Sequence, residues 1–239
     1  MAGQHYLVIA LPTSLEEGPR KGGLNKAHLL CWLGIQYCGR NKVKHNLAVA
    51  CWNVRSLLDT QQQMERKTAI LAKEFRRYDI DIVALSETHL LDEGKLEEVG
   101  TGYTFFWKGR PSNATRQSGV GFAVKSSFVG SLDNLPRGIN DRLMTLRLPL
   151  SGGQFLTLVS SYAPTMNAFE EMKEKFYDDL RNIIGAVPKK DKLLVLGDFN
   201  ARVGSNHCTW KNVLGINTAL EERTVMGHFC CHFVLRTGL

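Results

Sequence analysis

Short apolar runs alternate with two longer amphipathic segments from about residue 47 onward. Leu47–Trp52 is a continuous apolar run that stops at Asn53, and this pattern predicts a buried strand. Other apolar or alternating runs predict further strands at residues 80–85, 102–107, 119–124 and 193–196. The alternation in 142–148, the turn Ser151-Gly152-Gly153 and the run 155–161 together predict a hairpin.

Two segments show the spacing of amphipathic helices. The first spans residues 60–78, and Thr60-Gln61-Gln62-Gln63 at its start matches a capping box. The second spans about residues 168–184. The side chains predicted to share one face are Met64, Thr68, Leu71, Phe75 and Tyr78 in the first helix, and Met172, Phe176, Leu180 and Ile183 in the second. Mixed strands, a hairpin and two helices predict a layered α/β protein.

The two ends of the chain lack this regular pattern. Residues 1–45 contain Gly-Pro and Gly-Gly pairs with scattered basic residues, and only residues 27–37 have the pattern of a short helix or strand. We therefore expect an N-terminal extension with little independent structure. A domain is expected over residues 46–215, followed by a divergent tail over residues 216–239.

Composition and charge narrow the class of protein. The 239 residues are 44% hydrophobic and 22% charged, which is typical of a globular chain long enough for one domain. The net charge of +7 favours polyanionic partners, because Lys and Arg near phosphates release condensed counterions, although many basic proteins bind no nucleic acid. No obligate protein partner can be deduced.

The sequence also indicates a compartment. Its six cysteines contain no CxxC pair, which favours a reducing environment. No apolar run is long enough to cross a bilayer, and residues 7–11 are too short for a secretion signal. We expect an intracellular protein of the nucleus or cytoplasm that is neither secreted nor bound to a membrane.

Polar side chains follow several predicted strands at the points where these strands end, and they are Asn53, Glu87, Tyr162, Asp198 and Asn200. Strand ends are held by the sheet yet open onto solvent, so such side chains can converge on one site. Asn53 and Glu87 carry the oxygen ligands that suit a hydrated Mg²⁺. Alone, each has a simpler explanation, as a turn cap for Asn53 and as an exposed loop residue for Glu87.

The segment Gly197-Asp198-Phe199-Asn200 is the most informative of these strand ends. Asp198 and Asn200 are two positions apart, so both can face the same side of an extended chain. Asp198 can orient and deprotonate a water molecule, while Asn200 holds a phosphate oxygen or positions that carboxylate. The alternative is an Asx turn that closes the strand. Tyr162 can donate to a phosphate oxygen, or it can serve only in amphipathic packing.

A basic loop next to Trp107 is a candidate nucleic-acid contact. Its basic residues are Lys108, Arg110 and Arg116. Such loops can bind a nucleic-acid backbone while the aromatic residue stacks on a base. A solvated surface loop explains the same residues equally well.

Five motifs in a fixed order resemble the endonuclease/exonuclease/phosphatase superfamily. They are Trp52-Asn53-Val54-Arg55, Leu85-Ser86-Glu87-Thr88, Gly119-Val120-Gly121-Phe122, Ser161-Tyr162-Ala163-Pro164 and Gly197-Asp198-Phe199-Asn200. Within the superfamily, the chain is most similar to the endonuclease domains of non-LTR (LINE-type) retrotransposons and the related craniofacial development protein 2-like sequences. The phrase from Gly197 to Gly204 is typical of that branch, and the likeness covers about residues 47–215.

The resemblance implies a four-layered α/β sandwich in which two β-sheets pack face to face with helices outside. It implies Asn53 and Glu87 at a Mg²⁺ site that also accepts Mn²⁺, and Tyr162 at the scissile phosphate. Asp198 would orient or activate the nucleophile, with Asn200 in support. The catalytic set would then be Asp198, Asn200, Tyr162 and Glu87, with DNA as the substrate that is nicked on one strand.

One departure from the superfamily pattern concerns its end. The superfamily normally has a late Asp and a final Asp-His pair, but no Asp follows Asp198 in this sequence. We therefore expect the sandwich to be incomplete at its C-terminal part and phosphodiester cleavage to be reduced. Two alternatives remain open: a catalytically inactive retrotransposon-derived remnant that binds nucleic acid, and a phosphatase that acts on a small phosphoester.

Overall fold

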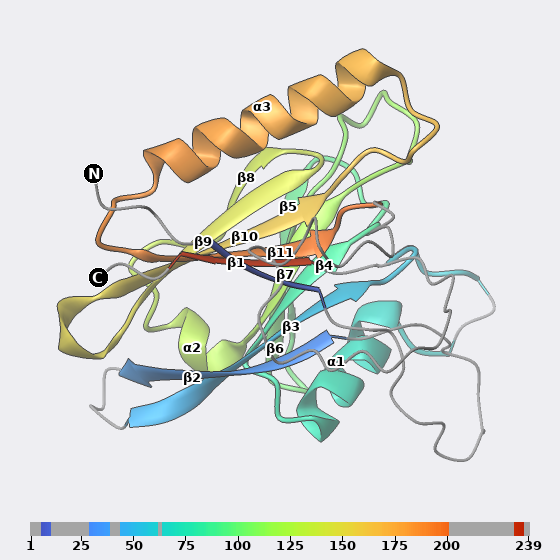
Figure 1. Ribbon diagram of the computed structural model, residues 1–239. Coiled ribbons are helices and arrows are strands. Elements are labelled where there is room, and N and C mark those ends of the chain that lie inside the picture. The colour runs from blue at the N-terminus through green and yellow to red at the C-terminus, as the bar shows by residue number, and fades with distance from the viewer. Residues whose placement is uncertain (1–5, 11–28, 39–43, 62–63, 201–231, 237–239) are drawn as a thin grey trace, which may run out of the picture.

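Two six-stranded sheets pack face to face, and one long helix covers the outer face of each (Figure 1). The structure is a computed structural model that describes residues 6–10, 29–38, 44–61, 64–200 and 232–236. The helix α1 (Lys67–Arg77) lies on the outer face of one sheet, and α3 (Glu170–Ala186) lies on the other. The predicted four-layered α/β sandwich is confirmed.

The first sheet, here called the β3 sheet, has the strand order β2 (Leu29–Cys38), β3 (Lys44–Asn53), β4 (Ile82–Ser86), β7 (Val120–Lys125), β6 (Tyr103–Lys108), β5 (Glu93–Glu98). The second, the β10 sheet, has the order β1 (Tyr6–Ala10), β12 (His232–Arg236), β11 (Lys192–Asp198), β10 (Phe155–Tyr162), β9 (Leu143–Pro149), β8 (Arg137–Asn140). A short helix α2 (Ser126–Val129) and a 3₁₀ turn η1 (Ser151–Gly153) complete the described elements.

Each sheet contains a parallel strand pair joined by one of the two long helices. The pair β3 and β4 is connected through α1, and the pair β10 and β11 is connected through α3. Parallel neighbours need such a crossover because a tight turn cannot bring the chain back in the same direction. As a result, the two strands of each pair end at the same edge of their sheet.

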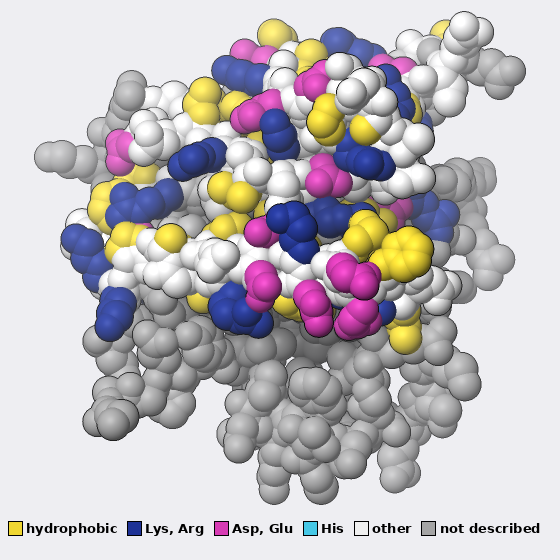
Figure 2. Space-filling view, turned by 90° about the horizontal axis from the view of Figure 1, so that it is seen from above, with side chains coloured by type: hydrophobic (Ala, Val, Ile, Leu, Met, Phe, Trp, Pro, Cys, Tyr) yellow, Lys and Arg dark blue, Asp and Glu magenta, His cyan; other side chains and the backbone are white. Residues whose placement is uncertain are grey.

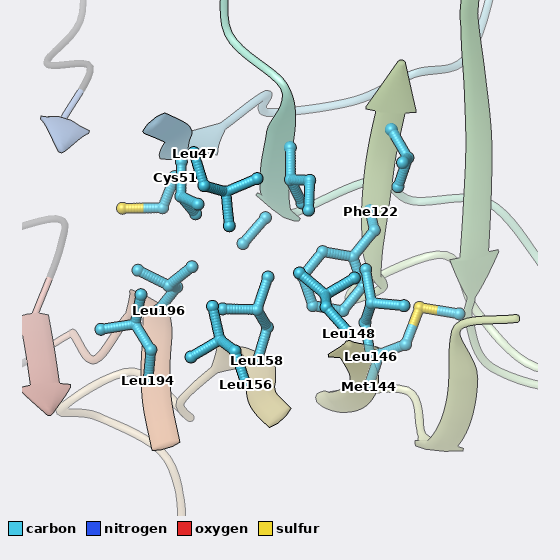
Figure 3. Close-up of a cluster of buried hydrophobic side chains, with 14 of the residues drawn as sticks. Leu47, Cys51, Phe122, Met144, Leu146, Leu148, Leu156, Leu158, Leu194 and Leu196 are labelled. Atoms are coloured by element: carbon cyan, nitrogen blue, oxygen red, sulfur yellow. The ribbon is translucent and has the colours of Figure 1, made fainter. Parts of the chain in front are cut away.

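The alternation of side chains along the strands fills three apolar layers. In β4, Ile82 and Ala84 face the interior between the sheets, while Val83 and Leu85 face α1. The same alternation holds in β11, where Leu194 and Leu196 face inward (Figure 3). Since both faces of these strands are buried, they read as continuous apolar runs in the sequence.

Both helices begin later than the sequence predicts. The helix α1 starts at Lys67 rather than at residue 60, and the main-chain N–H of Lys67 donates to Asp59 Oδ1 at 2.8 Å. The predicted capping box is therefore wrong, and Met64 is fully exposed instead of facing the core. The reason is that the chain before the helix is held beside the segment that follows β4, where the N–H of Leu57 donates to the Thr88 carbonyl at 2.8 Å.

The remaining helix predictions hold in the middle of each helix. Thr68, Leu71 and Phe75 of α1 are buried, and so are Phe176 and Leu180 of α3. Two residues predicted on the core faces, Tyr78 and Met172, are exposed, because they lie near the helix ends where the sheet no longer covers them.

Several strands lie outside the predicted set. Within residues 1–45, which were expected to carry little independent structure, Tyr6–Ala10 is a strand because it pairs with β12. Leu29–Cys38, which pairs with β3, corresponds to residues 27–37, where a short helix or strand was predicted. The strand β12 falls within the predicted tail and pairs with β11. The described sheets therefore extend beyond both predicted domain limits, 46 and 215. No described helix is long and apolar enough to cross a membrane.

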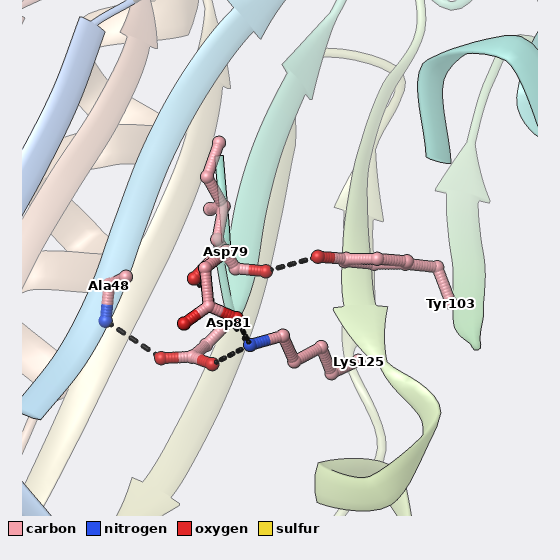
Figure 4. A network of polar contacts seen from close by, with 6 residues as sticks. Ala48, Asp79, Asp81, Tyr103 and Lys125 are labelled. Carbon is pink, nitrogen blue, oxygen red and sulfur yellow. Dashed lines mark hydrogen bonds and ion pairs between the residues drawn. The ribbon is translucent and has the colours of Figure 1, made fainter. Parts of the chain in front are cut away.

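A polar network fixes the end of the β3 sheet where β4 begins (Figure 4). The buried Asp81 accepts hydrogen bonds from the main-chain N–H of Ala48 at 2.8 Å and from Lys125 Nζ at 2.7 Å. Lys125 also donates to Asp79 at 2.7 Å, and the Tyr103 hydroxyl donates to the carbonyl just before Asp81. Burial opposes the charge on Lys125, but its hydrogen bonds to both aspartates raise its pKa. The network ties β3, β4, β6 and β7 together at this end.

Candidate functional site

The five predicted strand-end residues come together where the two parallel strand pairs end. Asn53 lies at the end of β3 opposite Ser86, the last residue of β4, and Glu87 follows directly. In the other sheet, Tyr162 at the end of β10 lies opposite Asp198 at the end of β11. The two sheets are also linked close to this point. Here the Ser160 hydroxyl of β10 donates to the Leu85 carbonyl of β4 at 3.1 Å.

Asn53 joins the two carboxylates of the site. Its Nδ2 donates to Glu87 Oε1 at 2.8 Å and to Asp198 Oδ2 at 2.9 Å, while its Oδ1 accepts from the main-chain N–H of Arg55 at 3.0 Å. One amide from the β3 sheet therefore holds a carboxylate from each sheet. The hydrogen bond to Arg55 fixes which way this amide is turned.

Asp198 is 3% exposed and is held by the segment that follows it. Its Oδ1 accepts from the main-chain N–H of Asn200 at 2.9 Å, and its carbonyl accepts from the N–H of Ala163 at 2.8 Å. The side-chain Nδ2 of Asn200 donates to the Ala163 carbonyl at 2.8 Å. The local bond from Asn200 to Asp198 has the form of the Asx turn. The turn and the convergence on Asn53 therefore occur together, and one does not exclude the other.

The Tyr162 hydroxyl faces the same carboxylates. Its side chain is 6% exposed and makes a hydrogen bond with Glu87. Burial raises the pKa of the Tyr162 phenol most strongly, and the negative charges of Glu87 and Asp198 raise it further, while Arg142 lowers it. The phenol consequently stays protonated near neutral pH and can donate a hydrogen bond.

Left-handed backbone conformations occur at three of the strand exits that form the site. The φ angles are 56° at Arg55, 57° at Glu87 and 47° at Asn200. Non-glycine residues in this region cost on the order of 1 kcal/mol each, more for Arg and Glu than for Asn. Such strain persists where the surrounding hydrogen bonds enforce it, and Glu87 and Asn200 both take part in the bonds described above.

The donor set of the site fits a hydrated hard cation. Glu87 and Asp198 bring two carboxylates, the oxygen donors that Mg²⁺ and Mn²⁺ prefer, and Asn53 Nδ2 holds both of them while its Oδ1 accepts from the Arg55 N–H. Across the described ranges, no group of three or more His, Cys, Asp and Glu assembles as a closed cage would require. A Mg²⁺ that keeps several of its waters needs only one or two carboxylates, so the residues present match that ion.

Of the three basic residues predicted to bind nucleic acid, Lys108 ends β6 and the other two lie in the loop between β6 and β7. Lys108 Nζ forms an ion pair with Glu93 at 3.5 Å, and Arg110 donates to Thr115 Oγ1 within its own loop at 2.9 Å. Arg116 donates to the carbonyl of His89, two residues after Glu87, at 3.4 Å. Of the three, Arg116 is therefore the residue that contacts the segment following Glu87.

The described part of the face that carries α3 is of mixed charge and is not a continuous basic patch (Figure 2). Figure 2 shows Lys and Arg side chains interspersed with Asp and Glu over the described part of this face. Several of these charges are paired within α3, for example Lys173 with Glu170 at 3.2 Å and Arg181 with Asp178 at 2.5 Å. This face therefore does not favour a long polyanion.

Reasoning from strand ends missed Arg142, which directly precedes β9. Its guanidinium lies over the Tyr162 ring, 5.1 Å from the centroid, and its Nη1 donates to the Tyr162 carbonyl at 3.2 Å. The signal was present in the predicted hairpin. In an antiparallel pair the start of one strand lies beside the end of the other, so residues 142 and 162 must be neighbours.

Comparisons with known proteins agree with this geometry. A family model described as the Endonuclease/Exonuclease/phosphatase family matches residues 50–217. Craniofacial development protein 2 from Bos taurus is 31% identical over 197 residues, covering 79% of this chain and 30% of that protein. The same protein from Tragulus javanicus is also 31% identical, with 79% of this chain and 31% of that protein covered. The chain spans about a third of the length of these curated relatives.

Solved structures share the fold. The human Nocturnin catalytic domain with bound sulfate anion aligns with a TM-score of 0.50 and 16% identity, covering 87% of this chain and 85% of that one. An endonuclease/exonuclease/phosphatase family protein from Leptotrichia buccalis aligns with a TM-score of 0.50 and 14% identity, covering 81% and 88%. The resemblance to the superfamily and to craniofacial development protein 2-like sequences is confirmed. This chain belongs to the endonuclease/exonuclease/phosphatase family.

Proposed function

We propose that this domain is a Mg²⁺-dependent phosphodiesterase of the retrotransposon endonuclease type that nicks DNA, with reduced activity because no Asp follows Asp198 in the sequence. The observation that carries the proposal is the Asn53 amide, which joins Glu87 and Asp198 at 2.8 and 2.9 Å beside the buried Tyr162 hydroxyl. Two carboxylates, an amide and a protonated phenol at one point provide cation ligands, a base and a hydrogen-bond donor for hydrolysis of a phosphodiester.

Each side chain has a role that follows from its contacts. Glu87 would hold Mg²⁺, which, when bound, stabilises the negative charge that develops on the phosphate oxygens, and Asn53 would keep the Glu87 carboxylate in place through its Nδ2. Tyr162 would donate to a non-bridging phosphate oxygen. Asp198 would accept a proton from the attacking water, and Asn200 would keep that carboxylate in place through its main-chain N–H.

DNA is the proposed substrate because of the charge of the chain and the position of Arg116. The net charge of +7 favours a polyanion over a small phosphoester, and Arg116 is anchored two residues from Glu87. From that position it can contact a phosphate that flanks the scissile one. A phosphatase acting on a small phosphoester remains the competing proposal, and it requires no such flanking contact.

Nicking of supercoiled plasmid by the full chain tests the proposal. With Mg²⁺ we expect conversion to open-circular DNA that is abolished by EDTA and falls about 100-fold or more in Glu87→Gln and Asp198→Asn. Glu97→Gln is the matched control, because Glu97 is an exposed carboxylate on β5 away from the site.

Three other results would each contradict the proposal. Nicking that survives both substitutions would place the chemistry elsewhere. A protein that is folded by circular dichroism, binds DNA and does not nick would indicate a remnant without catalysis. Hydrolysis of a small phosphoester without nicking would indicate a phosphatase.

A further inference from the structure

The turn between β8 and β9, residues 140–142, makes side-chain contacts with both α3 and the β3 sheet. Asn140 Oδ1 accepts from the main-chain N–H of Arg142 at 2.8 Å, and Asn140 Nδ2 donates to Asp179 of α3 at 3.1 Å. The side chain of Asn140 therefore sets the conformation of the turn and fixes it to the helix above the β10 sheet.

The next residue of the turn reaches the other sheet. Asp141 Oδ2 accepts from the hydroxyl of Ser118 at 2.5 Å, and the Ser118 side chain is almost fully buried just before β7. The neighbouring Gly119 carbonyl accepts from the N–H of Thr88 at 3.1 Å, directly after Glu87. Through Asp141, the turn is connected to the loop that carries Glu87.

The third residue of the turn contacts Tyr162 in three ways. The guanidinium of Arg142 lies 5.1 Å from the centroid of the Tyr162 ring, and its Nη1 donates to the Tyr162 carbonyl at 3.2 Å. The Arg142 carbonyl accepts from the Tyr162 N–H at 2.9 Å. A guanidinium that lies over the ring and is held there by bonds to the main chain of the same tyrosine limits the positions that the ring can adopt.

We propose that Arg142 is a positioning residue for Tyr162. Asn140, through its bond to α3, and Asp141, through its bond to the β3 sheet, hold Arg142 in the position that this role requires. This inference rests on the proposed function. Tyr162 comes from one sheet and its partner Glu87 from the other, so the direction of the hydroxyl depends on how the two sheets are held at this point. The turn spans that junction, and its guanidinium lies directly against the Tyr162 ring.

A double-mutant cycle on plasmid nicking tests the positioning role. We expect Arg142→Met to lower kcat about 10- to 100-fold with little change in KM, because a misplaced hydroxyl affects the reacting geometry. In a Tyr162→Phe background, Arg142→Met should cost less than about 3-fold, since the hydroxyl that it positions is already absent. Arg142→Lys should restore little, because an ammonium cannot stack as a plane. Equal costs in both backgrounds, or an effect confined to KM, would overturn the proposal.

A spectroscopic measurement separates this inference from the proposed function. In protein labelled with 3-fluorotyrosine, the fluorine resonance of Tyr162 is identified by its loss in Tyr162→Phe. Arg142→Met should shift this resonance, whereas Arg137→Met, a change at an exposed arginine of β8, should leave it in place. A shifted resonance in a protein that does not nick would support the positioning and refute the nuclease. An unmoved resonance would refute the positioning whatever the activity.

A milder variant keeps the test informative if Arg142→Met does not fold. Ser118→Ala removes the hydroxyl that Asp141 accepts from and leaves Arg142 itself intact. We expect it to move the Tyr162 resonance and lower kcat in the same direction as Arg142→Met, by about 3- to 10-fold. No effect of Ser118→Ala on either quantity would overturn the claim that the turn transmits the arrangement of one sheet to the other.

Discussion

Replacing Asn53 by alanine should destabilise the protein in a way that depends on a divalent cation. The change removes two hydrogen bonds to carboxylates, at 2.8 and 2.9 Å, and leaves Glu87 and Asp198 without the amide between them. Hydrogen bonds to charged groups contribute about 1.5–3 kcal/mol each, and the lower value applies to a partly buried site. The expected loss is therefore about 3 kcal/mol.

Urea unfolding in the presence of EDTA measures this loss. In thermal unfolding of a chain of this size, the same loss of about 3 kcal/mol corresponds to a fall of about 6–12 °C in Tm. Asn134→Ala is the matched control, because it removes an exposed amide from a loop away from the site. A difference between the two variants of less than about 0.5 kcal/mol would show that the amide bridge does not stabilise the fold.

Adding MgCl₂ completes the experiment. If the ion binds Glu87, it compensates the repulsion between Glu87 and Asp198, and at 100 times its Kd it contributes about 2.7 kcal/mol. We expect it to recover most of the stability lost in Asn53→Ala. The gain should be small in a Glu87→Gln protein, which keeps one carboxylate only. Equal gains in Glu87→Gln and in Asn53→Ala would show that the ion binds elsewhere, and the assignment of these residues would be wrong.

Three further predictions concern the scaffold and the strained backbone. Asp191→Ala should cost about 2 kcal/mol in urea unfolding, because its fully buried carboxylate accepts from Arg147 at 2.6 and 3.1 Å; a loss below about 0.5 kcal/mol would refute this. Glu87→Gly should have a free energy of unfolding about 1 kcal/mol higher than Glu87→Ala, because glycine adopts φ 57° without strain. Equal Tm values of the two variants would argue against strain. Burial, followed by two nearby carboxylates, raises the pKa of Tyr103, so its contribution to stability is complete below pH 10 and is lost above it. Tyr103→Phe should flatten the alkaline fall in stability, and parallel curves would contradict the assignment.

Strands buried on both faces were predictable from the sequence because burial leaves a continuous apolar run. In β4, Ile82 faces one core and Val83 the other, and both positions are apolar. The edge strands β5 and β8 were not predicted. Glu93, Lys95 and Glu97 of β5 are exposed charges, which is how an edge strand avoids pairing with another chain and also why it resembles a loop.

Strands that depend on distant partners were also missed. The strand β1 is next to β12, more than two hundred residues away in the sequence, and no local pattern reveals that pairing. The late start of α1 has a similar cause. Thr60 begins a sequence that matches a capping box, but Leu57 is bonded to Thr88, and the Asp59 carboxylate accepts from the Lys67 N–H at the actual start of the helix. Tertiary contacts therefore decided a boundary that local propensity left open.

The members of the site were predictable, but the bonds between them were not. A polar residue after a buried strand marks a strand end, and this rule found Asn53, Glu87 and Asp198. It could not show that one amide donates to both carboxylates, because that contact depends on the distance and angle between two sheets. The nucleic-acid roles of Lys108 and Arg110 stay predictions, since their side chains bind Glu93 and their own loop.

The precision of this junction depends on small groups behind the site. A side chain at Gly197, where φ is 146°, would overlap with the carbonyl oxygen of Ser161, so only glycine lets β11 approach β10 at this position. The adjacent Ser160 hydroxyl ties β10 to Leu85 of the facing sheet, two residues before Glu87. Catalytic groups must be held within about 0.5 Å of a productive arrangement. Because Asp198 directly follows Gly197, the close approach of β11 to β10 and the tie between the sheets fix Asp198 relative to Glu87, before any bond within the site is counted.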